Sequence, residues 1–181
     1  VPVINGLSDS FHPCQLLADL LTYIEARGSI ENKNVVWLGD GNNMCHSYMN
    51  AARIFNFQLI VSCPKEFVPN SEIFESSKKN TSIEHDPYKA ADGADLIITD
   101  VWASMGKEDE QKDRKEKFMK YQVNSEIMSC AKDNALFMHC LPAHRGEEVT
   151  EDVLEGPQSI VWEEAGNRLH SQKALLEFLL M

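Results

Sequence analysis

Near-continuously apolar runs alternate with amphipathic or polar segments along this chain. Five apolar runs are rich in β-branched residues, as strands buried on both faces of a parallel sheet are; they lie at 34–40, 57–63, 94–100, 135–141 and 159–165. The flanking and intervening segments predict helices at 11–28, 42–56, 69–80, 86–93, 113–131 and 167–181. This alternation indicates right-handed βαβ units. We therefore expect an α/β fold with a doubly wound, mainly parallel five-stranded sheet and helices on both faces, a Rossmann-like three-layer sandwich.

Composition narrows the class of protein. With 181 residues, of which 43% are hydrophobic, the chain can form one well-cored domain or two small ones. It has no apolar run long enough to span a membrane and no secretory signal at its start, and its five cysteines lack the spacing of a disulfide framework. We therefore expect a cytoplasmic protein. The net charge of −11 argues against binding to nucleic acid or to an anionic membrane.

The run at 135–141 ends in a histidine and a cysteine, His139 and Cys140, and Pro142 then stops the strand. In open α/β sheets, ligands bind outside the carboxyl ends of the strands, so these two residues are candidates for a site. If both belong to the strand, their side chains point to opposite faces, which argues against a Cys–His dyad. The Cys/His spacings do not fit zinc either, and no metal is expected. A buried structural cysteine is the alternative for Cys140.

The first predicted strand ends in the turn "GDGNNM", residues 39–44, which resembles the start of a dinucleotide-binding fingerprint. The third glycine of that fingerprint is replaced by Met44, and the next strand ends without an acid to hold a ribose, so dinucleotide binding is disfavoured. The turn presents two carboxamides, Asn42 and Asn43. We expect one to cap the following helix and the other to face the crevice.

Asp100 lies at the carboxyl end of the run at 94–100 and is suited to holding an ammonium group. The alternative is that it caps the following turn. The loop residues Ser104, Met105 and Gly106 follow, and a patch of ten charged residues in twelve begins there. We expect this patch, 106–117, to be a solvated loop that leads into an exposed helix. A glycine beside a long charged segment also suits a closing lid.

Two further segments place polar side chains near the same crevice. His12 and Gln15 are three residues apart, so both can overhang the start of the helix at 11–28, where unpaired N–H groups favour an anion or a carbonyl oxygen. The alternative for His12 is a helix cap. Arg168 is expected just past the fifth strand, at a helix start that faces the crevice, although it could also be a surface residue.

Five motifs together resemble the ornithine carbamoyltransferases. "HPCQ", "GDGNN", "DVWASMG", "HCLP" and "EAGNR" occur here in the order and at about the spacing of that family. "HCLP" is typical of carbamoyl transfer and "D-x-W-x-SMG" of ornithine. The resemblance covers the whole chain but only the second half of the enzyme, and the S-x-R-T-R-type segment that binds the phosphate does not occur. It implies that residues 1–181 form the C-terminal ornithine-binding domain, without the N-terminal carbamoyl-phosphate-binding domain.

By resemblance, the reaction is attack of the ornithine side-chain amine on carbamoyl phosphate, which gives citrulline and phosphate in a step of arginine biosynthesis or of the urea cycle. The implied catalytic residues are Cys140, Asp100, His12 and Arg168. The implied ornithine-binding residues are Asn43, Asp100, Ser104 and Met105. The implied contacts to carbamoyl phosphate are His12, Gln15, Cys140, the Leu141 carbonyl group and Arg168. Cys140 and Asp100 would hold and deprotonate the amine, while His12, Cys140 and Arg168 would stabilise the developing oxyanion.

The resemblance also implies no covalent intermediate, no metal and no cofactor. The partners would be L-ornithine, carbamoyl phosphate and the missing N-terminal domain, and the parent enzyme would be a homotrimer. We expect the chain alone to be inactive. The alternative is a non-catalytic module that binds ornithine or a related amino acid without turnover.

Overall fold

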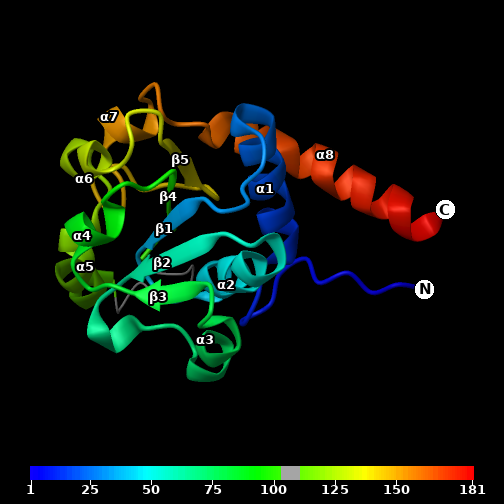
Figure 1. The fold of residues 1–181 in the computed structure, drawn as a ribbon, viewed down its shortest axis with the longest axis horizontal. Coiled ribbons are helices and arrows are strands. Elements are labelled where there is room, and N and C mark those ends of the chain that lie inside the picture. Colours follow the sequence, from blue (N-terminus) through cyan, green and yellow to red (C-terminus); the bar gives the residue numbers. More distant parts are fainter. Residues whose placement is uncertain (103–110) are drawn as a thin grey trace.

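The computed structural model describes residues 1–102 and 111–181, and its centre is a sheet of five parallel strands (Figure 1). The strands lie in the order β3-β2-β1-β4-β5. Their bounds are β1 (Asn34–Leu38), β2 (Gln58–Ser62), β3 (Thr81–Ile83), β4 (Leu96–Thr99) and β5 (Leu136–His139). The strand order reverses direction between β1 and β4, and ligands bind beside such a switch point in open α/β sheets.

Helices cover both faces of the sheet, so the predicted three-layer α/β architecture is confirmed. One layer contains α1 (Pro13–Arg27), α2 (Asn43–Phe55) and α3 (Ser71–Ser77), with α8 (Val161–Leu180) packed along α1. The other layer contains α4 (Pro87–Ala91), α5 (Gln111–Phe118), α6 (Ser125–Cys130) and α7 (Glu151–Leu154). The 3₁₀ helices are η1 (Lys65–Phe67) and η3 (Met119–Tyr121). Among the described residues, no helix is both long and apolar enough to cross a membrane.

Alternation along β1 explains how one strand serves both layers. Val35 and Trp37 belong to the core beneath α1 and α2, whereas Val36 and Leu38 belong to the core beneath α4 and α6. Successive side chains of a strand point to opposite faces, so a central strand must be apolar at every position. All four of these residues are fully buried.

The predicted strand at 159–165 is wrong. Ser159 forms an isolated bridge with Phe137, and α8 begins two residues later, at Val161. The apolar part of this segment is short, and Glu163 and Glu164 follow it in the first helical turn, where carboxylates interact favourably with the helix dipole. The fifth strand of the sheet is instead β3, which pairs with β2 and is too short to form a recognisable apolar run.

The predicted helix at 113–131 is interrupted. It is divided into α5, η3 and α6, and between η3 and α6 the backbone at Val123 bridges to Val149. Asn124 then starts α6, and its side chain accepts a hydrogen bond from the Ile127 amide. A capping asparagine inside an otherwise helical pattern marks a new helix start.

The glycines of the turn after β1 serve close packing. A Cβ atom on Gly41 would lie 2.4 Å from the backbone nitrogen of Pro69, so only glycine fits against the loop before α3. Gly39 has a φ of +135°, which side-chain-bearing residues rarely adopt. The turn itself therefore requires both glycines.

Candidate active site

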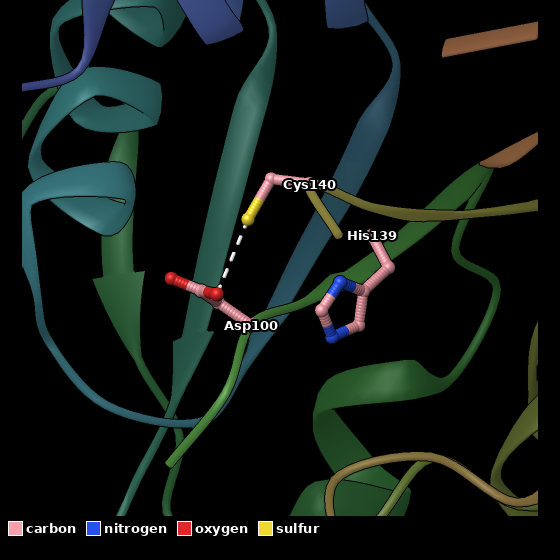
Figure 2. Close-up of side chains that lie close together, drawn as sticks. All are labelled: Asp100, His139 and Cys140. Carbon is pink, nitrogen blue, oxygen red and sulfur yellow. Dashed lines mark hydrogen bonds between the residues drawn. The ribbon is translucent and has the colours of Figure 1, made fainter. Parts of the chain in front are cut away.

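Asp100 and Cys140 meet at the carboxyl edge of the sheet. β4 and β5 are neighbours with Thr99 opposite His139, so the residues that follow them also lie side by side. The Cys140 thiol donates a hydrogen bond of 3.1 Å to Asp100 Oδ1 (Figure 2). The other carboxylate oxygen, Oδ2, accepts from Asn42 Nδ2 at 2.8 Å. Residues after three neighbouring strands, β1, β4 and β5, therefore converge on one carboxylate.

Asn42 is the one of the two carboxamides that caps α2, a choice that the prediction had left open. Its side-chain oxygen accepts hydrogen bonds from the amides of Met44 and Cys45 at the start of α2. Since its amide nitrogen donates a hydrogen bond to Asp100, this one side chain both caps α2 and orients the Asp100 carboxylate. The Asp100 Oδ1 atom also accepts from the Val101 amide at 2.7 Å, so the alternative role of Asp100 in the following turn is present as well.

The environment of Cys140 keeps the thiol protonated. Burial, reinforced by the Asp100 carboxylate, raises the pKa of this thiol well above its usual value. A thiol is nucleophilic as its thiolate, and reactive cysteines have lowered pKa values. The arrangement thus suits hydrogen bonding by Cys140 and disfavours a covalent role.

His139 turns away from Cys140 and is fully buried (Figure 2). Its Nε2 pairs with Glu148 Oε1 at 3.1 Å, and its Nδ1 accepts from the Leu141 amide at 2.9 Å. Asp100, His139 and Cys140 offer ligand atoms within 4.8 Å of one another. However, both ring nitrogens of His139 are already engaged, so a metal ion would have to displace one of these bonds. Glu148, which holds the imidazole, was not identified from the sequence.

His12 lies at the start of α1, as predicted, but its side chain does not cap the helix. Its backbone amide donates to Ser47 Oγ on α2 at 2.8 Å. Burial lowers the pKa of His12, partly offset by a backbone hydrogen bond with Gly6, so the ring is neutral at pH 7. The ring atom Nδ1 is buried and has no hydrogen-bond partner among the residues that the structure describes.

Arg168 does not lie at a helix start, contrary to the prediction. It lies in the second turn of α8, which begins at Val161 because the expected preceding strand is absent. Since α8 packs along α1, Arg168 Nη1 reaches Gln15 Oε1 at 2.6 Å. Within residues 1–102 and 111–181, Arg168 Nε is buried and has no hydrogen-bond partner, like His12 Nδ1. The charges of Arg168 and Asp100 also influence the pKa of His12, the first lowering it and the second raising it.

The other residues predicted to bind the substrates are Asn43, Leu141, Ser104 and Met105. Asn43 Nδ2 donates to the Ser8 carbonyl oxygen at 2.9 Å, which ties α2 to the N-terminal segment. Leu141 has a φ of +48° and precedes a cis peptide bond to Pro142. Ser104 and Met105 lie outside the described residues.

Arg114 is an unpredicted feature of the charged patch. The described part of this patch is mostly exposed, but the Arg114 side chain is only 11% exposed. It pairs with Asp40 after β1, donates to the Trp102 carbonyl oxygen and stacks over Phe67 at 4.5 Å. The expectation of a fully solvated patch is therefore wrong at Arg114. Only the tertiary structure distinguishes Arg114 from the charged residues beside it.

A family model of the aspartate/ornithine carbamoyltransferase Asp/Orn-binding domain matches residues 31–179. The chain belongs to this family. It is 61% identical over 180 residues to the ornithine carbamoyltransferase of Methylococcus capsulatus, covering 99% of this chain and 60% of that protein. It is 56% identical to the anabolic ornithine carbamoyltransferase of Pseudomonas aeruginosa, covering 99% of this chain and 59% of the relative.

Solved structures agree with this membership. The ornithine carbamoyltransferase of Pyrococcus furiosus superposes with a TM-score of 0.93 at 49% identity, covering 97% of this chain and 58% of that one. The Burkholderia thailandensis enzyme gives 0.91 at 50% identity, covering 100% of this chain and 59% of that one. The chain thus spans about 60% of the length of these carbamoyltransferases and matches their C-terminal part.

Proposed function

We propose that this chain supplies the ornithine half-site of an ornithine carbamoyltransferase. The reaction would transfer the carbamoyl group of carbamoyl phosphate to the side-chain amine of L-ornithine, giving L-citrulline and phosphate. The observation that carries the proposal is the Asp100–Cys140 pair at 3.1 Å. It lies where the carboxyl ends of neighbouring parallel strands meet, and Asp100 contributes to the electrostatic environment of His12.

In this proposal, Asp100 receives the side-chain ammonium group of ornithine. A carboxylate pairs with the ammonium and accepts the proton that the amine must lose before it attacks. Cys140, protonated in the free protein, retains sulfur lone pairs that can accept a hydrogen bond from the amine. Asn43, Ser104 and Met105 would hold the amino-acid end of ornithine.

The unpaired nitrogen atoms His12 Nδ1 and Arg168 Nε support the second half of the mechanism. Buried polar atoms without a partner are rare in folded proteins, so these two nitrogen atoms are candidates for contacts to a substrate. Together with Cys140, these side chains would stabilise negative charge on the carbonyl oxygen of carbamoyl phosphate. Gln15 and the Leu141 carbonyl group would receive the carbamoyl NH₂ group.

We further propose that residues 1–181 act as the C-terminal domain of a two-domain, homotrimeric enzyme. The carbamoyl phosphate dianion needs several charge-assisted donors, whereas this half contributes Arg168 and a neutral His12. The missing donors would come from the N-terminal domain. The far end of α8 projects from the body of the molecule and exposes Leu176 and Phe178, apolar surface that such a domain could cover (Figure 1).

The test is citrulline formation by this chain joined to the N-terminal part of the Methylococcus capsulatus relative. We expect ornithine-dependent turnover that saturates with both substrates. A folded fusion that binds ornithine in calorimetry but makes no citrulline would favour the alternative, a non-catalytic amino-acid-binding module. No turnover and no ornithine binding would contradict both.

A further inference from the structure

Two carboxyl groups lie buried between α1 and α8, next to the proposed site. Asp19 is 2% exposed and Glu164 is 1% exposed. Between them lies the Gln15 amide, whose Nε2 donates to Asp19 Oδ1 at 2.8 Å and to Glu164 Oε1 at 3.1 Å. The amide oxygen on the opposite side accepts from Arg168 Nη1 at 2.6 Å.

The outer oxygens of the two carboxyl groups are also bound. Tyr48 on α2 donates its hydroxyl group to Asp19 Oδ2 at 2.7 Å. The His139 amide at the end of β5 donates to Glu164 Oε2 at 3.0 Å. The pair is therefore connected to the end of β5, directly before Cys140, as well as to the helices that carry Gln15 and Arg168. It is part of a network in which every carboxyl oxygen has a donor.

Burial limits the negative charge on the two carboxyl groups of this network. Burial raises the pKa of Asp19 to about 6 and that of Glu164 well above its usual value, and the mutual repulsion of the two groups raises that of Glu164 further. Two adjacent buried carboxyl groups cannot both ionise without a large cost. At neutral pH, Glu164 therefore keeps its proton, and the ionised Asp19 faces the Arg168 guanidinium across Gln15.

This arrangement determines which way the Gln15 amide points. A glutamine amide has two N–H donors at one end and one acceptor at the other. If it flipped, its oxygen would face the Asp19 carboxylate and its NH₂ group would face the Arg168 guanidinium, so the contacts to these two charged groups would become repulsive. Gln15 is itself 2% exposed, whereas Arg168 is partly exposed, so the guanidinium is the end of the network that reaches the site.

Building on the proposed function, we propose that Asp19 and Glu164 are positioning residues for the carbamoyl half of the reaction. They hold the Gln15 amide, and the amide oxygen holds Arg168 toward the carbonyl group of carbamoyl phosphate. Ornithine, which would bind at Asp100, lies outside this chain of contacts.

The test is steady-state kinetics of the fusion with carbamoyl phosphate and ornithine varied separately. Asp19→Asn introduces donors where Gln15 and Tyr48 already donate, so we expect the KM for carbamoyl phosphate to rise at least tenfold. The KM for ornithine should stay within twofold. Glu164→Gln puts an NH₂ group where either Gln15 or the His139 amide already donates. We therefore expect the KM for carbamoyl phosphate to rise in this variant as well, with the KM for ornithine again within twofold. The matched control is Glu163→Gln, which alters the exposed neighbouring residue and should change neither value.

Tyr48→Phe tests the positioning role of Asp19 with less risk to folding, because it removes only the hydrogen bond from Tyr48 to Asp19 and keeps the aromatic ring. We expect a smaller rise, about threefold, again confined to carbamoyl phosphate. Equal effects on both substrates, or a lowered melting temperature with unchanged kinetics, would overturn the positioning role and leave the proposed function intact. If the unmodified fusion makes no citrulline, the proposed function fails first, and this inference fails with it.

Discussion

Asp100 accepts hydrogen bonds from Asn42, Val101 and Cys140, which orient its carboxylate at the end of β4. This orientation supports the binding role proposed for Asp100, because the side chains of two other loops converge on its carboxylate. The sequence indicated that Asp100 and Cys140 would be close, since both follow strands of a parallel sheet. It did not indicate that Asn42 would complete the group.

We predict that Asp100→Asn in the fusion impairs ornithine use far more than folding. The substitution removes a charge-assisted contact to the ammonium group, worth about 1.5–3 kcal/mol. This corresponds to at least a tenfold loss in kcat/KM for ornithine, by roughly 1.4 kcal/mol per factor of ten. Asp92→Asn, at an exposed position, serves as the control in the same assay. Unchanged kinetics with a lowered melting temperature would instead support a purely structural cap.

Cys140→Ser should leave the fusion with weak but measurable turnover. The serine hydroxyl group still donates and accepts hydrogen bonds, which is the role that the raised pKa of the thiol favours. A covalent nucleophile would give nearly complete inactivity and a thiocarbamoyl adduct. Rapid-quench mass spectrometry of the unmodified fusion with carbamoyl phosphate distinguishes the two, and we expect no adduct. Normal kinetics of the serine variant with lower stability would mean that Cys140 is structural.

At the scale of elements, the packing of α8 along α1 places residues of the proposed site in the buried interface between these two helices. This packing buries Asp19 and Glu164 together and brings Arg168 to Gln15. None of these contacts could be predicted from the sequence, because the partners lie about 150 residues apart and α8 was expected to begin later. A helical period identifies one buried face, but not which residues of another helix it meets.

The buried carboxyl pair predicts a specific pH dependence of stability. Asp19 has its pKa raised from 3.8 to about 6 in the folded protein, so the folded state binds more protons than the unfolded state between these pH values. This contribution to the free energy of unfolding is complete below about pH 4 and lost as the pH rises through about 6. Its size is on the order of 3 kcal/mol.

The measurement is urea unfolding of the chain between pH 4 and 7, compared with the Asp19→Asn/Glu164→Gln double variant. The stability of the original chain relative to the double variant should fall as the pH rises. A relative stability that rises over this range would mean that the carboxyl groups are both ionised and paired with cations.

Alanine substitutions of Gly41, in the β1–α2 turn, and of Gly166, in α8, should have opposite effects on stability. Gly41→Ala would place a Cβ atom 2.4 Å from the Pro69 nitrogen, so the backbone must shift and the free energy of unfolding should fall by about 1–3 kcal/mol. Gly166→Ala in α8 meets nothing within 4 Å and should instead stabilise the helix by about 0.5–1 kcal/mol. Chemical denaturation measures both. If Gly41→Ala stabilised the chain as much as Gly166→Ala, the turn would be able to accommodate a side chain at position 41.

At the scale of the whole molecule, the sequence predicts the sheet better than it predicts the periphery. β1, β2, β4 and β5 were identified because central parallel strands are continuously apolar. β3 was missed because three residues at the sheet edge carry too little pattern, and the segment that begins α8 was mistaken for a strand because its few apolar residues follow a loop. Strand ends located Asp100 and Cys140, while the environments of Arg168 and Arg114 depend on contacts between distant elements.

The central claim is that this chain is one half of a carbamoyltransferase site. The most direct test measures citrulline with the chain alone and after addition of the separately produced N-terminal part of the Methylococcus capsulatus relative. We expect no measurable citrulline from the chain alone, since Arg168 and a neutral His12 cannot hold the phosphate of carbamoyl phosphate, and partial activity once the two parts are mixed. Robust citrulline formation by the chain alone would contradict the account.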